Sequence, residues 1–381
     1  MQRVKADELL AKSVLTFVNE FRQTRMIPPG TNGPRAHTMT SLRNGAHWLI
    51  ACCRVDSWAP SEELRRVIAE LRDLLLSPAA RPGGFTHQLR IPTQRKMDAS
   101  CGLIGPAWIM EALVAAAETL SDERCLDLAE RLFFLHRYSQ REAMWHVRDV
   151  DGSINDIDLA LDHQIWFAAC AALIQYRRSE EIRATVGDFL NRLPRNMGLS
   201  ADGRIRFMAR EVRSRWRVQA SHLKSAVKRV LSVESNVESQ HSTATLEAGY
   251  HAFSTYALGM LARVIPDHPL WRGPLVKAAT SYLVTEEYRV LLDSNLFAYP
   301  YNPPGFEVPF SLAALGELQE SEVVHIASGW FQEQLRRTFD PLTWSLTRNT
   351  ADPQTLRARI YEATRLPHRV LAQVEVELPD Q

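Results

Sequence analysis

The sequence predicts an all-α fold in which helical hairpins stack into a closed ring. Three tryptophans, Trp48, Trp108 and Trp166, are spaced 60 and 58 residues apart, and each is followed thirteen positions later by a serine and two acidic residues. Such a triplet is typical of a helix N-terminus, because the hydroxyl accepts a free backbone N–H and the acids interact favourably with the helix dipole. At about 60 residues per hairpin the chain holds roughly six units, a longer period than that of the common helical solenoids.

Helical periodicity of apolar residues supports this reading along the chain. It covers the ranges 9–21, 41–54, 61–77, 102–120, 122–137, 157–176, 180–192, 217–232, 243–264, 274–290, 309–319 and 321–337. Turns inside a hairpin are short, whereas the segments that join hairpins are long: 26–38, 78–99, 139–156, 193–216 and 291–308. Because helix direction alternates, we expect the long segments at one end of the ring. Long loops in a compact domain are often functional.

Two short segments depart from the helical pattern. An Asp202-Gly203 turn followed by alternating side chains predicts a small β-hairpin near 199–210. Alternation at Val374, Val376 and Leu378 predicts a short edge strand near the C-terminus. No linker-like composition divides the chain, so we expect a single toroidal domain over 1–381.

Composition narrows the function classes. Lys plus Arg number 45 and Asp plus Glu 44, so no overall charge favours nucleic acid or a membrane surface. No apolar run approaches the roughly 18 residues of a membrane span, and the N-terminus lacks the apolar region of a signal peptide, which predicts a cytoplasmic protein. The sequence leaves the oligomeric state open. The cysteines have no metal-binding spacing, so we expect buried thiols and neither a metal nor a cofactor; they are Cys52, Cys53, Cys101, Cys125 and Cys170.

The sharpest local signal is a segment with four prolines that begins at Tyr299. Prolines fix φ and stiffen the chain, which suggests a preformed site. Aromatic faces and an amide there could bind a sugar: Tyr299, Tyr301, Phe306 and Asn302. Burial of Glu307 would raise its pKa and suit it to act as a general acid. The alternative is that Glu307 simply lies in the first turn of the next helix, near its dipole.

A second cluster stands where the long segment 139–156 leads into the Trp166 helix. Asp162, His163 and Gln164 could bring an acid, a titrating imidazole and an amide to the mouth of the ring. The alternative is a helix N-terminal acid followed by a hydrogen-bonded core histidine.

Further candidates lie elsewhere in the chain. Tyr250 and His251 could act as base and acid, or could be a half-buried aromatic step in a helix. Glu238 and His241 are candidate binding residues; neither His241 nor His251 has a second histidine four positions away, so the helical metal-binding pair is absent. Asp98 could bind substrate, or could pair with the basic residues that precede it.

The densest basic cluster consists of Arg204, Arg206, Arg210, Arg213, Arg215 and Arg217. It is either a solvated face paired with acids or a rim that attracts an anionic polymer.

Together these features resemble the carbohydrate-active (α/α)6 toroids: the six-hairpin glycosidases, the acylglucosamine 2-epimerase-like enzymes and the helical-toroid polysaccharide lyases. The residues that carry the resemblance are the tryptophan repeat, Asp162-His163-Gln164, Gly249-Tyr250-His251-Ala252-Phe253 and the proline-rich segment through Glu307. In those families carboxylates, histidines and tyrosines at the ring mouth act as acid or base, while aromatic residues bind sugar. The resemblance implies such catalytic roles for Glu307, Asp162, His163, Tyr250 and His251.

Three functions follow as hypotheses. The first is a glycoside hydrolase that cleaves an oligo- or polysaccharide, with Glu307 as general acid and Asp162 as the base that activates water. The second is a uronate-directed lyase or a sugar epimerase, in which Tyr250, His251 or His163 removes a proton beside a carbonyl or carboxylate and the arginine cluster holds an anionic substrate. The third is a toroid that binds glycan or protein without catalysis.

Overall fold

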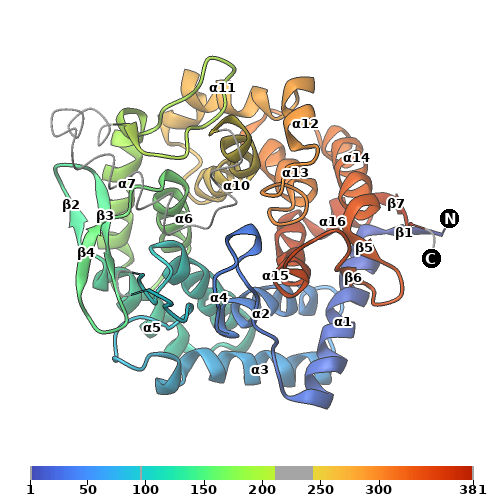
Figure 1. The fold of residues 1–381 in the computed structure, drawn as a ribbon, viewed down its shortest axis with the longest axis horizontal. Helices are drawn as coiled ribbons and strands as arrows, with labels where there is room; N and C mark the ends of the chain where they lie inside the picture. The colour runs from blue at the N-terminus through green and yellow to red at the C-terminus, as the bar shows by residue number, and fades with distance from the viewer. Residues whose placement is uncertain (1, 95–96, 211–242, 380–381) are drawn as a thin grey trace.

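The computed structural model describes residues 2–94, 97–210 and 243–379, and it confirms the closed ring of helical hairpins. In this part of the chain the inner wall consists of α2 (Leu42–Asp56), α4 (Ile104–Leu120), α6 (Leu161–Ala172), α10 (Thr243–Val264), α13 (Pro304–Leu315) and the 3-10 helix η6 (Arg359–Arg365). Each inner helix contacts the next, and η6 contacts α2, which closes the ring (Figure 1).

Outer helices cover this wall. They are α1 (Ala6–Thr24), α3 (Glu62–Leu76), α5 (Glu123–Leu135), α7 (Ser179–Asn196), α11 (Pro274–Tyr282), α12 (Glu286–Leu292) and α14 (Glu320–Thr338). Their sequences are amphipathic: α3 buries Leu64, Val67, Ile68, Leu71 and Leu75, which share one helical face. The inner helices are buried on nearly all sides, as expected for helices enclosed by a second layer.

The tryptophan repeat marks inner helices, since Trp48, Trp108 and Trp166 lie buried on α2, α4 and α6. The predicted serine caps are correct in the first unit, where Ser61 accepts a hydrogen bond from the Leu64 amide at 3.1 Å. They are wrong in the other two. Asp122 caps α5, because Ser121 takes the left-handed conformation that ends α4, and Ser179 already belongs to α7.

The long connections lie at one end of the ring, as predicted. Each joins an outer helix to the start of the following inner helix, whereas the turns from inner to outer helices, such as 57–61 and 121–122, are short. The N-terminal turns of the inner helices therefore share one end, which we call the mouth.

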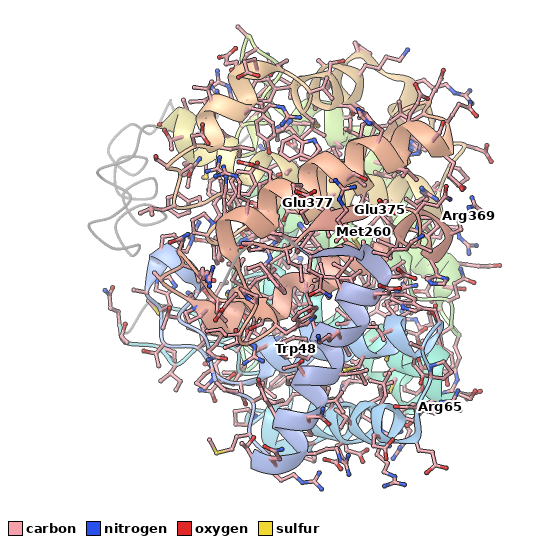
Figure 2. The ribbon with its side chains drawn as sticks, turned by 90° about the vertical axis from the view of Figure 1, so that its right-hand side faces the viewer. Trp48, Arg65, Met260, Arg369, Glu375 and Glu377 are labelled. Atoms are coloured by element: carbon pink, nitrogen blue, oxygen red, sulfur yellow. The ribbon has the colours of Figure 1, made fainter. Side chains whose placement is uncertain are left out.

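Small strands occur among these connections. Leu199 and Ile205 form an antiparallel bridge, which confirms the small β-hairpin. The predicted C-terminal strand is β7 (Glu375–Glu377), which pairs with β1 (Arg3–Lys5) beside the start of α1 (Figure 2). Unpredicted strands are β2 (Tyr138–Ser139), β3 (Met144–Arg148) and β4 (Ile154–Ile157) in one sheet, and the pair β5 (Phe339–Asp340) and β6 (Ser345–Leu346).

Several helix predictions need correction. The predicted helix 274–290 is divided into α11 and α12, because Thr285 caps a new helix by accepting from the Tyr288 amide at 3.2 Å. Helix α13 begins at Pro304 rather than residue 309, since proline is well suited to a first helical turn. The last inner segment was not predicted, and neither was α15 (Pro353–Ala358) before it. The predicted helix 217–232 lies outside the described residues.

The remaining short helices are η1 (Gly33–Arg35), η2 (Pro78–Ala80), η5 (Pro269–Arg272) and α16 (His368–Leu371). None of the helices within the described ranges has the length and apolar character needed to cross a membrane.

The connection between α1 and α2 lies across the middle of the ring (Figure 1). Gly33 has φ +60° and packs so closely that an added Cβ would lie 2.1 Å from the Tyr301 ring. The Asp352 carboxylate accepts hydrogen bonds from the amides of Thr31 at 2.8 Å and Gly33 at 2.9 Å, and also caps α15 through the Thr355 amide at 3.1 Å. This mouth loop, residues 28–37, is thus anchored to the start of α15, which packs beside α2.

Replacing Asp352 with alanine is expected to loosen the mouth loop. Three charge-assisted hydrogen bonds are lost, so we expect a decrease of roughly 3 kcal/mol in the free energy of unfolding. Urea denaturation measures this cost, and hydrogen exchange at the Thr31 and Gly33 amides should accelerate. Asp352→Asn, which keeps one acceptor oxygen, should lie between wild type and Asp352→Ala. Unchanged exchange at these amides in Asp352→Ala would contradict the anchoring role.

Candidate functional site

The inner helices carry several polar side chains toward the interior of the ring. A purely structural core would have apolar side chains there. Several of these polar side chains have buried atoms without a hydrogen-bond partner among the described residues. These atoms are both ring nitrogens of His47, Nε1 of Trp108, both carboxyl oxygens of Asp162, one oxygen each of Glu307 and Glu362, and the Tyr361 hydroxyl. Burial of an unsatisfied polar group destabilises a fold, so the unpartnered atoms that face the ring interior are candidates for contact with a ligand.

Helix α2 provides a cation and an imidazole one turn apart. The Arg43 guanidinium lies 4.3 Å from the centre of the Trp108 ring and donates hydrogen bonds to Asn32 and to the Tyr301 hydroxyl. The His47 ring stacks on Tyr361 at 4.7 Å and meets Trp108 edge-on at 5.1 Å. Burial, and then the charges of Arg43 and Arg359, hold the pKa of His47 well below its usual value, so this imidazole is neutral.

At the start of α6, two aspartates flank a histidine. Asp158 lies 2.9 Å from Nδ1 of His163 and also accepts from the amides of Leu103 and Ala160, both at 3.1 Å. Burial lowers the pKa of His163, but attraction to Asp158 and Asp162 outweighs it and raises the pKa to about 9. Burial is the main cause that raises the pKa of Asp162. His163 is therefore positively charged at neutral pH.

The charge on His163 predicts a pH-dependent stability. Because its pKa rises from 6.5 to about 9 on folding, the stabilisation is complete below pH 6.5 and is lost as pH increases through about 9. The loss is at most about 3 kcal/mol. Urea denaturation between pH 6 and pH 10 should show the decline in wild type, and His163→Gln should show a flatter profile. Parallel profiles for the two proteins would contradict the charge assignment.

Tyr250 of α10 forms a hydrogen bond with the mouth loop. Its hydroxyl accepts a hydrogen bond from Nε of Arg35 at 3.1 Å. Its ring lies 6.4 Å from that of Tyr301, whose hydroxyl donates to Asn32 at 2.8 Å. Burial raises the pKa of Tyr250, which therefore remains protonated. Asp162 contributes to this shift, so Tyr250 and Asp162 share one electrostatic environment.

Glu307 lies in the first turn of α13, as the alternative reading of the sequence has it, and it is fully buried. Arg359 lies 2.7 Å from one of its oxygens and also pairs with Glu362. Burial and then repulsion from Glu362 raise the pKa of Glu307, while Arg359 opposes the shift. Burial is also the main cause that raises the pKa of Glu362, to about 7. Glu307 thus belongs to a buried ion cluster with Arg359 and Glu362, and its pairing with Asp162 stays a prediction.

Three other predicted site residues make hydrogen bonds or ring contacts within the fold. His251 accepts from the Ile205 amide at 3.1 Å and its second nitrogen lies 2.9 Å from the Ala279 carbonyl oxygen, so both nitrogens are occupied away from the ring centre. The Gln164 amide bonds to the backbone of Trp145 and Asp158. Phe306 packs against an outer-layer ring at 4.9 Å. These contacts do not support the catalytic role predicted for His251 or the sugar contacts predicted for Gln164 and Phe306.

Three more binding candidates are fixed by local contacts. Tyr299 lies beneath Arg337, 4.5 Å from its guanidinium, and thus faces the outer layer. The Asn302 amide donates to the Gly249 carbonyl at 2.9 Å and accepts from Arg359. Asp98 accepts from the Gly102 amide at 2.6 Å and shapes the turn before α4.

Arg204, the first arginine of the predicted anion-binding cluster, does not lie on an exposed rim. Arg204 is buried and pairs with Asp202 at 2.9 Å and Glu247 at 3.5 Å, so it is neutralised inside the fold. Glu238, His241, Arg213, Arg215 and Arg217 lie outside the described residues.

Several polar residues near the ring centre were not among the predicted site residues. They are Asn32, Arg35, Arg43, His47, Arg359, Tyr361 and Glu362. A usable signal was present in α2, where Arg43 and His47 lie one turn apart on the same face of a buried inner helix. Among the described residues, no group of three or more His, Cys, Asp or Glu side chains is arranged to hold a metal ion.

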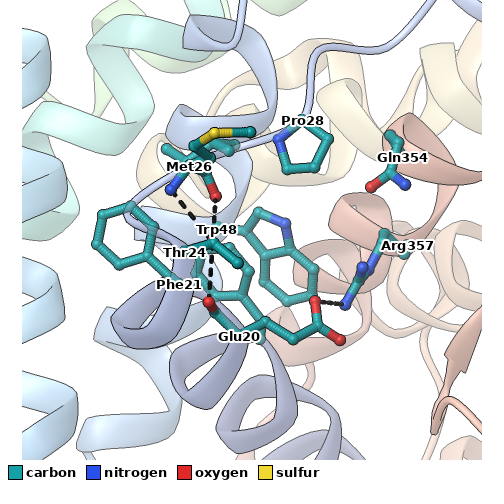
Figure 3. A pocket seen from close by; sticks show the side chains of 10 residues that line it. Glu20, Phe21, Thr24, Met26, Pro28, Trp48, Gln354 and Arg357 are labelled. Atoms are coloured by element: carbon teal, nitrogen blue, oxygen red, sulfur yellow. Dashed lines mark hydrogen bonds and ion pairs between the residues drawn. The ribbon is translucent and has the colours of Figure 1, made fainter.

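A pocket of about 250 Å³ lies outside the ring, between α1, α2 and α15 (Figure 3). Phe17 and Phe21 line it with Trp48, and an ion pair of 2.7 Å between Glu20 and Arg357 borders it. It includes none of the polar groups of the ring centre.

Comparison with known proteins agrees with this architecture. No protein-family model matches the sequence. The crystal structure of a sugar epimerase from a ruminal bacterium has the same fold, with a TM-score of 0.61, 10% identity, and coverage of 95% of this chain and 98% of that chain. A polysaccharide lyase is more distant, with a TM-score of 0.40, 10% identity, and coverage of 73% and 84%. The likeness to the sugar epimerase structure confirms the predicted toroidal fold.

One relative matches over almost its whole length. Archaeal glycosylation protein Q of Haloferax volcanii is 34% identical over 366 residues, which cover 94% of this chain and 96% of that protein. The chain therefore belongs to the same protein family as archaeal glycosylation protein Q.

Proposed function

We propose that this protein is a carbohydrate-active enzyme that modifies a sugar at the ring centre by proton transfer, as an epimerase or isomerase does. The family relationship to a glycosylation protein supports a carbohydrate substrate. The observation that carries the proposal is the set of buried, unpartnered polar atoms inside the ring, because a bound sugar would supply the missing hydrogen bonds.

The protonation states favour proton transfer. Neutral His47 can accept a proton, whereas Asp162, whose pKa is raised by burial, can donate one. In an epimerisation the C–H bond beside a carbonyl breaks, its proton passes to the base, and the electron pair forms an enolate. A proton returned to the opposite face of that carbon restores the carbonyl. Arg43 and charged His163 are suited to stabilise the enolate oxygen.

Hydrolysis of a glycosidic bond is the second candidate. The sequence predicted Asp162 as the base of such an enzyme, but burial raises its pKa, which is the direction that a general acid requires. Hydrolysis also needs a second carboxyl group, and the predicted partner, Glu307, is bound to Arg359 in a buried ion cluster. A uronate-directed lyase has less support, since Arg204, the described arginine at the head of the predicted anion-binding cluster, is buried and neutralised.

Product analysis in D2O tests these functions. Free monosaccharides, sugar nucleotides and oligosaccharides are incubated with the protein and examined by NMR and mass spectrometry. The proposal predicts a new epimer or isomer of unchanged chain length that carries solvent deuterium. New reducing ends without deuterium at carbon would indicate a hydrolase, and an unsaturated sugar that absorbs ultraviolet light would indicate a lyase. Binding of a sugar without any product would support the non-catalytic toroid.

A further inference from the structure

The polar groups of the ring centre are closed off from solvent. His47 is fully buried, and Asp162 and Arg43 are 2% and 1% exposed, although each carries an atom without a hydrogen-bond partner among the described residues. A sugar can reach such atoms only if part of the surrounding structure moves aside. The segment that lies across the middle of the ring is the mouth loop, residues 28–37 (Figure 1).

The mouth loop binds the ring centre through the side chain of Asn32. Its Oδ1 accepts hydrogen bonds from Nη1 of Arg43 and from the Tyr301 hydroxyl, the latter at 2.8 Å. Within the described part of the chain, the Arg43 guanidinium forms no ion pair with an acidic side chain, and its Nε has no hydrogen-bond partner. A buried cation needs acceptor oxygens around it. Asn32 supplies one that a hydroxyl or carbonyl oxygen of a sugar could also supply.

The loop is held in place by local contacts more than by regular secondary structure. Asn32 and Ala36 have φ values of +59° and +51°, a left-handed conformation that residues with side chains adopt at a cost. Such backbone conformations persist where neighbouring contacts impose them. The Asp352 carboxylate provides contacts of this kind at the amides of Thr31 and Gly33. The loop can therefore open when local contacts break, while the helices of the ring stay folded.

We propose that the mouth loop is a lid held shut by its own Asn32 amide, which occupies the place where an oxygen of the sugar binds Arg43 and Tyr301. Opening of the lid frees the donors of these two side chains, and closure over the sugar excludes water from the ring centre. This inference rests on the proposed function, because the sugar is the ligand that replaces Asn32. Opening itself does not require the sugar.

The test is modification of His47 by diethyl pyrocarbonate in the sugar-free protein, followed by mass spectrometry of each histidine. His47 lies on α2 one turn beyond Arg43, further from the mouth, so the reagent reaches it when the loop opens. His136, at the end of α5 in the outer layer, is the internal control. It is 3% exposed, and its Nε2 also has no partner among the described residues. Burial lowers the pKa of both imidazoles, so both are neutral and reactive at neutral pH.

Two variants should open the lid. Asp352→Ala removes three hydrogen bonds at the base of the loop and should accelerate the modification of His47 at least about tenfold. Asn32→Gly accommodates the left-handed backbone but lacks the amide, so it should accelerate the modification several-fold. The rate at His136 should stay the same in both. The matched control is Asp122→Ala, which removes the cap of α5 at the short-turn end of the ring and should leave the rate at His47 unchanged.

Two results would overturn the proposal. One is a His47 rate that stays at the wild-type value in either lid variant. The other is a parallel acceleration of His47 and His136, which would indicate unfolding of the whole ring instead of movement of a lid. Failure of the proposed function is distinguishable from both, because product analysis would then yield no modified sugar while His47 still responds to the two variants.

Discussion

Replacing Asp162 with asparagine is expected to reduce turnover roughly 100- to 10,000-fold, the usual contribution of a general acid or base. Asparagine has almost the same shape but cannot transfer the proton. Burial outweighs the favourable interactions of Asp162 and raises its pKa on folding, so its charged form opposes folding, and the free energy of unfolding should remain the same or increase. The rate of product formation and urea denaturation, measured on the same preparations, separate the two effects.

Glu307→Gln is the matched comparison, because Glu307 is equally buried but pairs with Arg359. Its substitution should reduce stability, since the ion pair is lost. A folded Asp162→Asn protein that retains activity within tenfold of wild type would remove Asp162 from the mechanism.

Replacing Arg359 with methionine is expected to reduce the free energy of unfolding by about 3–5 kcal/mol. The guanidinium binds both Glu307 and Glu362, and all three side chains are at most 2% exposed. Its removal leaves two buried carboxyl groups without a counter-charge. Urea denaturation measures the loss, and the double variant Arg359→Met/Glu307→Gln should recover part of it because one acid is then neutral.

The control is Arg369→Met. Arg369 pairs with Glu320 at 2.6 Å, but its side chain is 76% exposed, and exposed ion pairs contribute at most about 1 kcal/mol. Similar costs for Arg359→Met and Arg369→Met would show that the buried cluster does not hold α13 to η6.

The fold could be predicted because the inner helices have a repeated signature. Trp48, Trp108 and Trp166 mark equivalent positions of consecutive hairpins, and apolar periodicity distinguishes amphipathic outer helices from nearly uniform inner ones. The last inner segment escaped prediction for a physical reason. Between residues 359 and 365 it is a short 3-10 helix with two arginines and a glutamate, which in sequence looks like an exposed turn.

The site residues stay predictions, although the structure shows where each described candidate lies. Asp162 and His163 lie in the first turn of α6 and Tyr301 precedes α13, whereas Tyr250 lies about two turns into α10. The other polar residues of this region come from segments, such as the mouth loop, that no local sequence pattern singled out. Arg35 acts from a loop whose position depends on a distant carboxylate, Asp352. For His251, helical periodicity alone does not show which face of α10 meets the outer layer, where both ring nitrogens form hydrogen bonds.

The most direct measurement of the central claim is a crystal structure of the inactive Asp162→Asn protein with the sugar that product analysis identifies. Our account predicts that the sugar lies inside the ring, within hydrogen-bond distance of residue 162 and in contact with Arg43 or Tyr250. A sugar bound elsewhere, for example in the outer pocket beside Trp48 (Figure 3), with the ring centre unchanged, would contradict the account.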